Sequence, residues 1–101
     1  MDGLNFDNPY YKRVEGSRLL LIRCGHCKAS IAQYQKVGKG GVLRLYIDRI
    51  IKSSIDLSEL PEALFCPNCN AHLATKLALR KKNKDVYVMV RSAFNSSVLD
   101  G

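Results

Sequence analysis

Four cysteines form two pairs of identical C-x2-C spacing, and 38 residues lie between the pairs. The pairs are Cys24 and Cys27 in "CGHC", and Cys66 and Cys69 in "CPNC". A C-x2-C turn can direct two thiolates at one ion, and two such turns supply the four sulfurs of the tetrahedral shell that zinc prefers. Pro67 fixes its own φ directly after Cys66, which favours a preformed turn. The spacing therefore predicts one metal ion held by the four cysteines, zinc first and iron as the alternative.

The first pair also permits a redox interpretation, because "CGHC" resembles the redox motif of disulfide isomerases in the thioredoxin superfamily. The resemblance is confined to the stretch "CGHCKASIAQYQKV". That family has an aromatic residue before the first cysteine, where this chain has Arg23. It also has a long helix after the motif, whereas Gly38, Gly40 and Gly41 interrupt the chain here. A dithiol enzyme would leave the second cysteine pair unexplained, so the metal interpretation is favoured over a thiol-disulfide redox protein.

Two histidines, His26 and His72, lie close to the cysteines in the sequence and could in principle replace one of them as ligands. Because four thiolates already complete the shell, both histidines are predicted to be surface residues. A closed shell leaves no coordination position that could activate water, so the metal is predicted to be structural. The sequence has no recognisable catalytic constellation, and the glycine-rich 38–41 stretch lacks the Walker pattern and predicts a turn. We therefore predict that the protein is not an enzyme.

Hydrophobic alternation predicts mainly strands. Strands are expected over 17–23, 30–37, 42–51, 72–80 and 86–94, with a connecting segment over 53–65 that includes a short helical turn. In the 42–51 stretch, Leu43, Leu45, Ile47 and Ile51 would share one face, although a helical pattern is also compatible with it. The predicted organisation is a flexible segment over 1–16, one domain over 17–94 and a flexible tail over 95–101.

The order of the strands and the two C-x2-C turns resembles a zinc ribbon, in which such metal-binding turns are called knuckles. The resemblance is to a ribbon with an enlarged insertion between the knuckles, as in Mss-like and rubredoxin-like folds. The resemblance is carried by "CGHC" and "CPNC" together with the strand order. It implies a small, mainly β fold with β-hairpins, in which Cys24, Cys27, Cys66 and Cys69 are the metal ligands. The gap between the knuckles is longer than in the smallest ribbons, which leaves the subfamily open.

The chain is strongly basic, with 16 Lys and Arg against 9 Asp and Glu, a net charge of +7 and a pI near 9.4. Basic side chains interleaved with aromatic ones suit a phosphate backbone and stacked bases. We therefore predict nucleic-acid binding, with RNA preferred over DNA. The predicted contact residues are Arg44, Arg49, Arg80, Lys81, Lys82, Lys84, Tyr34 and Tyr46.

The alternative is a protein-protein adaptor that binds through an exposed strand edge or through the insertion, with Leu57, Leu60 and Leu64 as its apolar contacts. No small-molecule substrate is evident. No apolar run reaches the ~18 residues of a membrane-spanning helix, and the N-terminus does not read as a secretory signal. The expected location is the cytoplasm, where thiols stay reduced.

Overall fold

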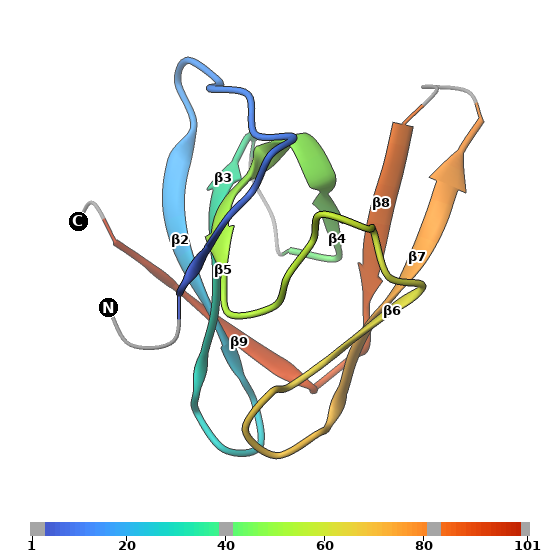
Figure 1. Ribbon diagram of the computed structural model, residues 1–101. Coiled ribbons are helices and arrows are strands. Elements are labelled where there is room, and N and C mark those ends of the chain that lie inside the picture. The colour runs from blue at the N-terminus through green and yellow to red at the C-terminus, as the bar shows by residue number, and fades with distance from the viewer. Residues whose placement is uncertain (1–3, 39–41, 81–83, 100–101) are drawn as a thin grey trace.

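The computed structural model describes residues 4–38, 42–80 and 84–99, which form strands and one short 3-10 helix in two antiparallel sheets (Figure 1). The first sheet has the order β1 (Phe6–Asp7), β5 (Ile50–Ser53), β3 (Ser30–Lys36), β2 (Arg18–Cys24) and β9 (Phe94–Val98). The second has the order β4 (Arg44–Tyr46), β8 (Lys84–Met89), β7 (His72–Leu79) and β6 (Ala63–Phe65). The helix η1 (Ile47–Arg49) joins β4 to β5. The predicted mainly β class is confirmed.

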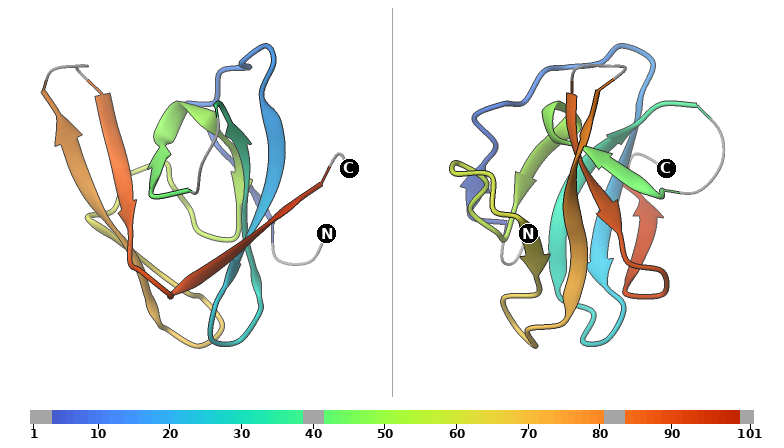
Figure 2. Two further views of the ribbon diagram at one scale, coloured as in Figure 1. Left: turned by 180° about the vertical axis from the view of Figure 1, so that it is seen from behind. Right: turned by 90° about the vertical axis from the view of Figure 1, so that its right-hand side faces the viewer.

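The two sheets converge at one end of the molecule and diverge toward the other, as the front and back views show (Figures 1 and 2). The β2–β3 and β6–β7 turns both lie at the converging end, which we call the narrow end. The opposite end is called the open end. There β4 and η1 lie between the β2–β3 pair and the β7–β8 hairpin (Figure 1). The cysteine turns and the end of the β7–β8 pair at Leu79 and Lys84 are therefore at opposite ends of the fold (Figure 1).

Side chains from both sheets fill the space between them. Ile22 and Ile50 of the first sheet and Leu45, Leu73 and Tyr87 of the second are all buried in one core. Each such apolar side chain contributes about 1.5–3 kcal/mol by leaving water. This shared core holds the two sheets in a fixed relation.

The predicted single strand over 42–51 is wrong. The helix η1 divides it into β4, which pairs with β8, and β5, which pairs with β3. Leu43, expected on the apolar face, is 75% exposed, whereas Leu45, Ile47 and Ile50 are buried. Because these three residues are not evenly spaced, a straight strand could not bury all of them, and the chain turns from one sheet to the other instead.

The chain outside 17–94 also takes part in the sheets, so the predicted domain boundaries differ from the strand pairing. β9 pairs with β2 from Leu20↔Val98 to Cys24↔Phe94, and β1 pairs with β5. The buried Asn8 side chain donates hydrogen bonds to the carbonyls of Ile47 (2.6 Å) and Ile50 (2.7 Å). The polar sequence of β9 gave no strand signal, but its backbone completes the hydrogen bonds of β2. Residues 1–3 and 100–101 lie outside the described residues.

Other predicted elements are close to those observed. The strands expected over 17–23, 30–37 and 72–80 correspond to β2, β3 and β7, whereas 86–94 covers parts of β8 and β9 and the turn between them. The connector has no helical turn, and its last residues form β6. Among the described residues η1 is the longest helix, and no helix is long and apolar enough to span a membrane.

Candidate metal centre

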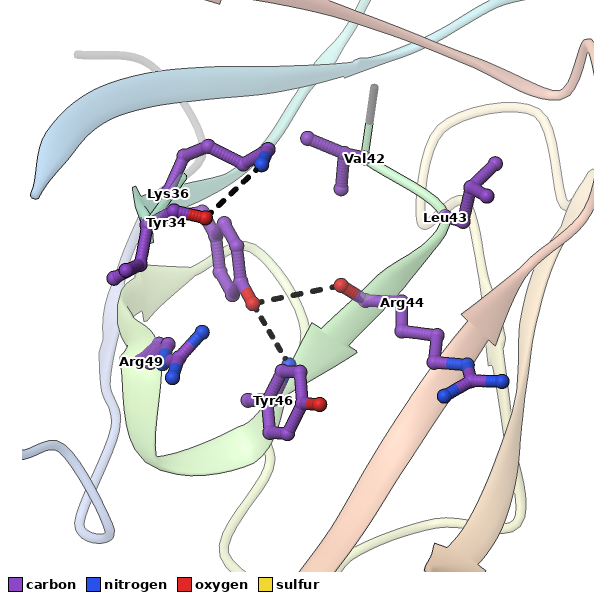
Figure 3. A pocket seen from close by; sticks show the side chains of 8 residues that line it. Tyr34, Lys36, Val42, Leu43, Arg44, Tyr46 and Arg49 are labelled. Atoms are coloured by element: carbon purple, nitrogen blue, oxygen red, sulfur yellow. Dashed lines mark hydrogen bonds between the residues drawn. The ribbon is translucent and has the colours of Figure 1, made fainter. Parts of the chain in front are cut away.

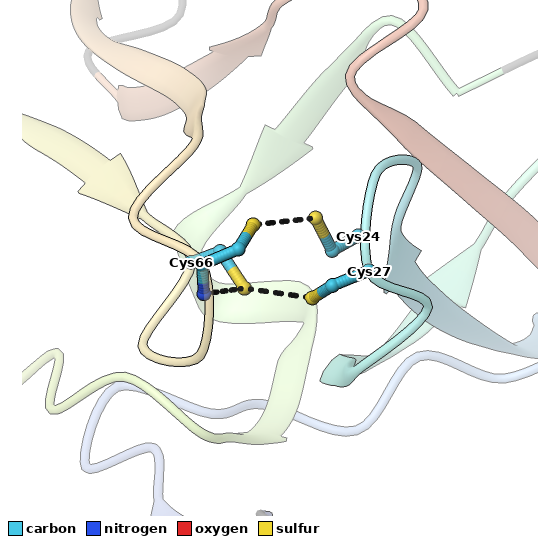
Figure 4. A group of neighbouring side chains, drawn as sticks. Cys24, Cys27 and Cys66 are labelled. Atoms are coloured by element: carbon cyan, nitrogen blue, oxygen red, sulfur yellow. Dashed lines mark hydrogen bonds between the residues drawn. The ribbon is translucent and has the colours of Figure 1, made fainter.

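Each cysteine pair lies on a turn of a different sheet. Cys24 ends β2, and the chain returns through Cys27 to β3 of the first sheet. Cys66 follows β6, and the chain returns through Cys69 to β7 of the second sheet. The two turns face each other across the narrow end (Figure 4). An ion bound by all four sulfurs would therefore link the two sheets directly.

The four sulfur atoms fit a single metal ion. The Sγ atoms of Cys24 and Cys69 are 3.6 Å apart, those of Cys27 and Cys66 are 3.5 Å apart, and all four lie within 4.8 Å of one another. A tetrahedron with Zn–S bonds of about 2.3 Å has sulfurs about 3.8 Å apart. The sulfurs are too far apart for disulfides, whose bond is about 2.05 Å long, and all four cysteines are free.

The two turns have the same backbone structure. In each one the first cysteine donates its N–H to the residue five positions later, and its carbonyl accepts from the residue four positions later. The bonds are Cys24 N to Ala29 O (2.9 Å), Lys28 N to Cys24 O (3.0 Å), Cys66 N to Ala71 O (2.9 Å) and Asn70 N to Cys66 O (2.7 Å). We call the two turns knuckles. Their shared geometry follows from the shared C-x2-C spacing.

Backbone amides also point at the sulfurs. The N–H of His26 lies 3.4 Å from Cys24 Sγ, and the N–H of Cys69 lies 3.5 Å from Cys66 Sγ. Hydrogen bonds from the Asn68 side chain and the Ala29 backbone lower the pKa of Cys27 to about 6. Such donors favour thiolate, which is the metal-binding form of cysteine.

The remaining thiols are shifted in different directions. Burial acts to raise the pKa of Cys24, but hydrogen bonds from the Cys27 and His26 backbone outweigh it, and that pKa is lowered. The Ala71 backbone bond favours the thiolate of Cys69, yet desolvation and the three neighbouring cysteines raise its pKa to about 12. Four sulfurs this close cannot all be charged without a cation, so a bound metal would take the place of the shared protons.

The histidines are not part of the sulfur cluster. His26 is exposed. His72 is also exposed, its Nε2 lies 3.0 Å from both Ala74 O and Thr75 Oγ1, and its ring centroid lies 5.2 Å from that of Phe65. Within the described ranges, the cluster that could hold a metal comprises the four cysteines. The exposure of both histidines agrees with the surface positions predicted for them.

Gly25 is a positioning residue that sequence reasoning did not single out. Its N–H donates to Ala93 O at 2.8 Å, so the turn between β8 and β9 packs against the first knuckle. A Cβ at position 25 would lie 2.9 Å from Ser92 O. A glycine between two cysteines gives no sign of this, because the contact comes from a distant part of the chain.

The side chains predicted to contact nucleic acid differ in exposure and in their neighbours. Arg44 and Arg80 are exposed, and Lys84 is exposed while its Nζ lies 3.2 Å from Asp48 Oδ2. The Arg49 guanidinium carbon lies 4.5 Å from the centroid of the Tyr46 ring, and Lys84 Nζ lies 5.9 Å from it. Lys81 and Lys82 lie outside the described residues.

Tyr34 cannot stack on a base as predicted, because it is only 2% exposed. Its hydroxyl accepts a hydrogen bond from Tyr46 N (3.0 Å) and donates one to Arg44 O (3.4 Å) (Figure 3). Burial raises the pKa of Tyr34. The side chain lies on the inward face of β3, where it ties the first sheet to β4.

The leucines proposed as adaptor contacts are also placed differently. Leu57 is 2% exposed and Leu64 is 3% exposed, while Leu60 is half-buried and packs against the core. These side chains support the fold, so the prediction that they form an interaction surface is wrong. Leu57 and Leu64 belong to the core that both sheets share.

Comparison with protein-family models, with curated proteins and with solved structures gives no match for this chain. The cysteine cluster and the placement of the charged side chains are therefore the features from which a function can be inferred.

Proposed function

We propose that this protein is a non-catalytic zinc protein with a ribbon-like pair of knuckles, and that its basic open end binds nucleic acid. Zinc is chosen over iron because four thiolates at tetrahedral spacing suit zinc, and nothing else in the sequence suggests electron transfer. The cytoplasm would keep the four thiols reduced and available to the metal.

The role of the metal follows from its ligands. Four thiolates fill the tetrahedral shell, so the ion has no open position for water or substrate. It would join the β2–β3 turn to the β6–β7 turn and so fix the two sheets at the narrow end. Structural zinc sites contribute apparent folding free energies of about 10 kcal/mol or more. Metal analysis of the native protein is expected to give one equivalent of zinc per chain. Well under one equivalent of zinc plus iron would contradict the site.

The observation that carries nucleic-acid binding is the gathering of basic residues at the open end. β2 begins with Arg18, and β3 ends with its register partner Lys36. In the second sheet, Arg80 follows β7 and Lys84 begins β8. All four positions are at the strand ends remote from the knuckles. Basic side chains of both sheets thus lie at the same end of the molecule, on either side of β4 and η1 (Figure 1).

The rest of the charge distribution supports the same surface. Arg44 and Arg49 lie on β4 and η1, between the two basic strand ends (Figure 1). Asp48 and Asp85 are also at this end, and Asp48 pairs with Lys84. By contrast, residues 53–75 contain three acids and no Lys or Arg. The basic residues at the open end favour a phosphate backbone there, because each contacted phosphate releases counterions.

The test compares two charge variants of equal size. One replaces Arg18, Arg44 and Arg80 with Gln at the open end, and the other replaces Arg23, Lys28 and Arg91 with Gln near the knuckles. For single-stranded RNA, the slope of log affinity against log salt should flatten by up to about 2 units in the first variant, since each phosphate contact contributes about 0.7. The second variant should keep the wild-type slope. Equal slopes in both variants, or no salt-sensitive binding by the wild type, would reject the proposal.

RNA is preferred over DNA, and a comparison of RNA and DNA strands of one sequence tests that preference. The adaptor remains the second candidate in its strand-edge form, because β9 has a neighbour, β2, on one side alone among the described strands. The adaptor function is favoured if the wild type fails to bind nucleic acid.

A further inference from the structure

A cavity of about 290 Å³ opens beside β4, between the end of β3 and η1 (Figure 3). Its size is at the lower end of small-molecule sites, which span about 300–1,000 Å³. A duplex could not enter it, whereas a single small group could. The buried Tyr34 ring and the half-buried Tyr46 ring both line it.

The polar lining of this cavity is cationic. Lys36, Arg44 and Arg49 contribute to it, and its lining includes no carboxylate. Figure 3 shows the Arg49 guanidinium turned toward the two tyrosines and the Arg44 guanidinium turned away from them. Among the described residues, neither arginine forms an ion pair with a carboxylate. Because burial raises the pKa of Tyr34, its phenol adds no negative charge at neutral pH.

The cation best placed to meet a ligand is Arg49. Its guanidinium lies 4.5 Å from the centroid of the Tyr46 ring, which restrains it beside the cavity. The Lys36 Nζ also lines the cavity and is held by the carbonyls of Val37 (3.1 Å) and Gly38 (3.5 Å). An arginine held in this way can present two N–H groups to phosphate oxygens, and a lysine adds a point charge.

The rest of the cavity lining is apolar. Val42 is buried, while Val37 is 41% exposed and Leu43 is 75% exposed. Leu43 is the most exposed of the large apolar side chains in the described part of the chain. Figure 3 shows Lys36 and Arg49 on one side and Val42 and Leu43 on the other, which matches an amphipathic anion with a charged group and a flat apolar face.

We infer that this cavity binds one nucleotide of a single strand, with its phosphate on Arg49 and Lys36 and its base against Leu43. The inference rests on the proposed nucleic-acid function and gives it a defined subsite. A base within a duplex has no free face to offer, so an unpaired nucleotide or a strand end is the ligand.

The experiment titrates the zinc-loaded protein with a 5′-mononucleotide, with the matching nucleoside and with inorganic phosphate, followed by amide NMR shifts. The mononucleotide should shift residues around the cavity and bind at least about tenfold more tightly than either fragment. Arg49→Gln should weaken mononucleotide binding by about tenfold or more. Leu43→Asn should weaken it as well while leaving phosphate binding unchanged. Arg91→Gln, near the knuckles, is the matched control and should bind as the wild type does.

The outcomes separate the subsite from the wider function. Short single-stranded RNA should compete with the mononucleotide in the wild type. If RNA binds with wild-type affinity to Arg49→Gln and the mononucleotide shifts no cavity residue, the subsite is rejected and the basic surface stands. If the mononucleotide binds in the cavity but RNA shows no binding, the nucleic-acid function is rejected and the pocket stands as a site for free nucleotides. Phosphate binding as tightly as the mononucleotide would overturn the assignment of the apolar lining to a base.

Discussion

Lys28 and Asn70 occupy the same place in the two knuckles and share a left-handed backbone, with φ of 68° and 63°. Each directly follows the second cysteine of its pair and donates its N–H to the carbonyl of the first. The knuckles are thus repeated in their backbone conformation, although their residues at this position differ. Asn tolerates a positive φ better than Lys does.

This difference predicts an asymmetric response to glycine. Lys28→Gly should remove a left-handed penalty of about 1–2 kcal/mol and lose about 0.4–1 kcal/mol through the freer unfolded chain, a net gain of up to about 1.6 kcal/mol. Asn70→Gly should change stability little, since less strain is relieved. Thermal or denaturant unfolding of the zinc-loaded protein measures both. A larger gain at position 70 than at position 28 would contradict the prediction.

Loss of any one ligand should remove the metal and the fold together. Replacing Cys24, Cys27, Cys66 or Cys69 by Ser, one at a time, is expected to abolish metal retention, because the site forms only when both sheets are folded. Metal analysis and far-ultraviolet circular dichroism check this. His26→Ala and His72→Ala are the controls and should retain a full equivalent of metal. A serine variant that keeps both its metal and its stability would remove that cysteine from the ligand set.

A methyl group at position 25 should separate the first knuckle from the β8–β9 turn. Gly25→Ala places a Cβ 2.9 Å from Ser92 O and 3.0 Å from Ala93 C, which are backbone atoms that cannot swing aside. We expect a loss of about 1–3 kcal/mol, as for other overpacked sites. His26→Ala, one residue along the same turn, serves as the control in the same unfolding experiment. Wild-type stability for Gly25→Ala would show that this contact is dispensable.

The buried Tyr87 hydroxyl, which donates to Pro61 O at 2.7 Å, should make stability fall in alkali. Burial, together with the charges of Glu62 and Asp85, raises the pKa of Tyr87 to about 12 from an ordinary value of 10. The folded state therefore holds this proton more tightly than the unfolded state. The contribution of the protonated Tyr87 hydroxyl to the free energy of unfolding is complete below about pH 10 and is lost as the pH rises toward 12.

Tyr87→Phe isolates this effect. At neutral pH the variant should be less stable by about 0.5–1.5 kcal/mol, because the hydrogen bond is lost. Between pH 10 and 12 the stability of the wild type should fall toward that of the variant, which lacks the ionising group. The measurement is the difference in unfolding free energy between the two proteins at each pH, so that effects of Tyr34 and the cysteines cancel. A difference that stays constant across this range would be evidence against the assignment.

The local pattern of the sequence determined the parts of this protein that depend on near neighbours. The C-x2-C spacing alone predicted two turns whose sulfurs could share an ion, and these sulfurs lie within 4.8 Å of one another. Alternation of apolar residues predicted β2, β3 and β7 to within one residue at either end. A turn of this kind and a two-residue period are both set by adjacent residues, so they can be read along the chain.

The tertiary structure decided which sheet each segment joined. Residues 42–51 divide between two sheets because Leu45, Ile47 and Ile50 must all reach one core, and the polar β9 forms a strand because β2 offers it hydrogen bonds. Tyr34 is buried for the same kind of reason, since its hydroxyl finds partners on β4. Strand pairing and burial of this kind depend on residues tens of positions away in the sequence. The alternation of apolar and polar residues within a segment therefore cannot predict them.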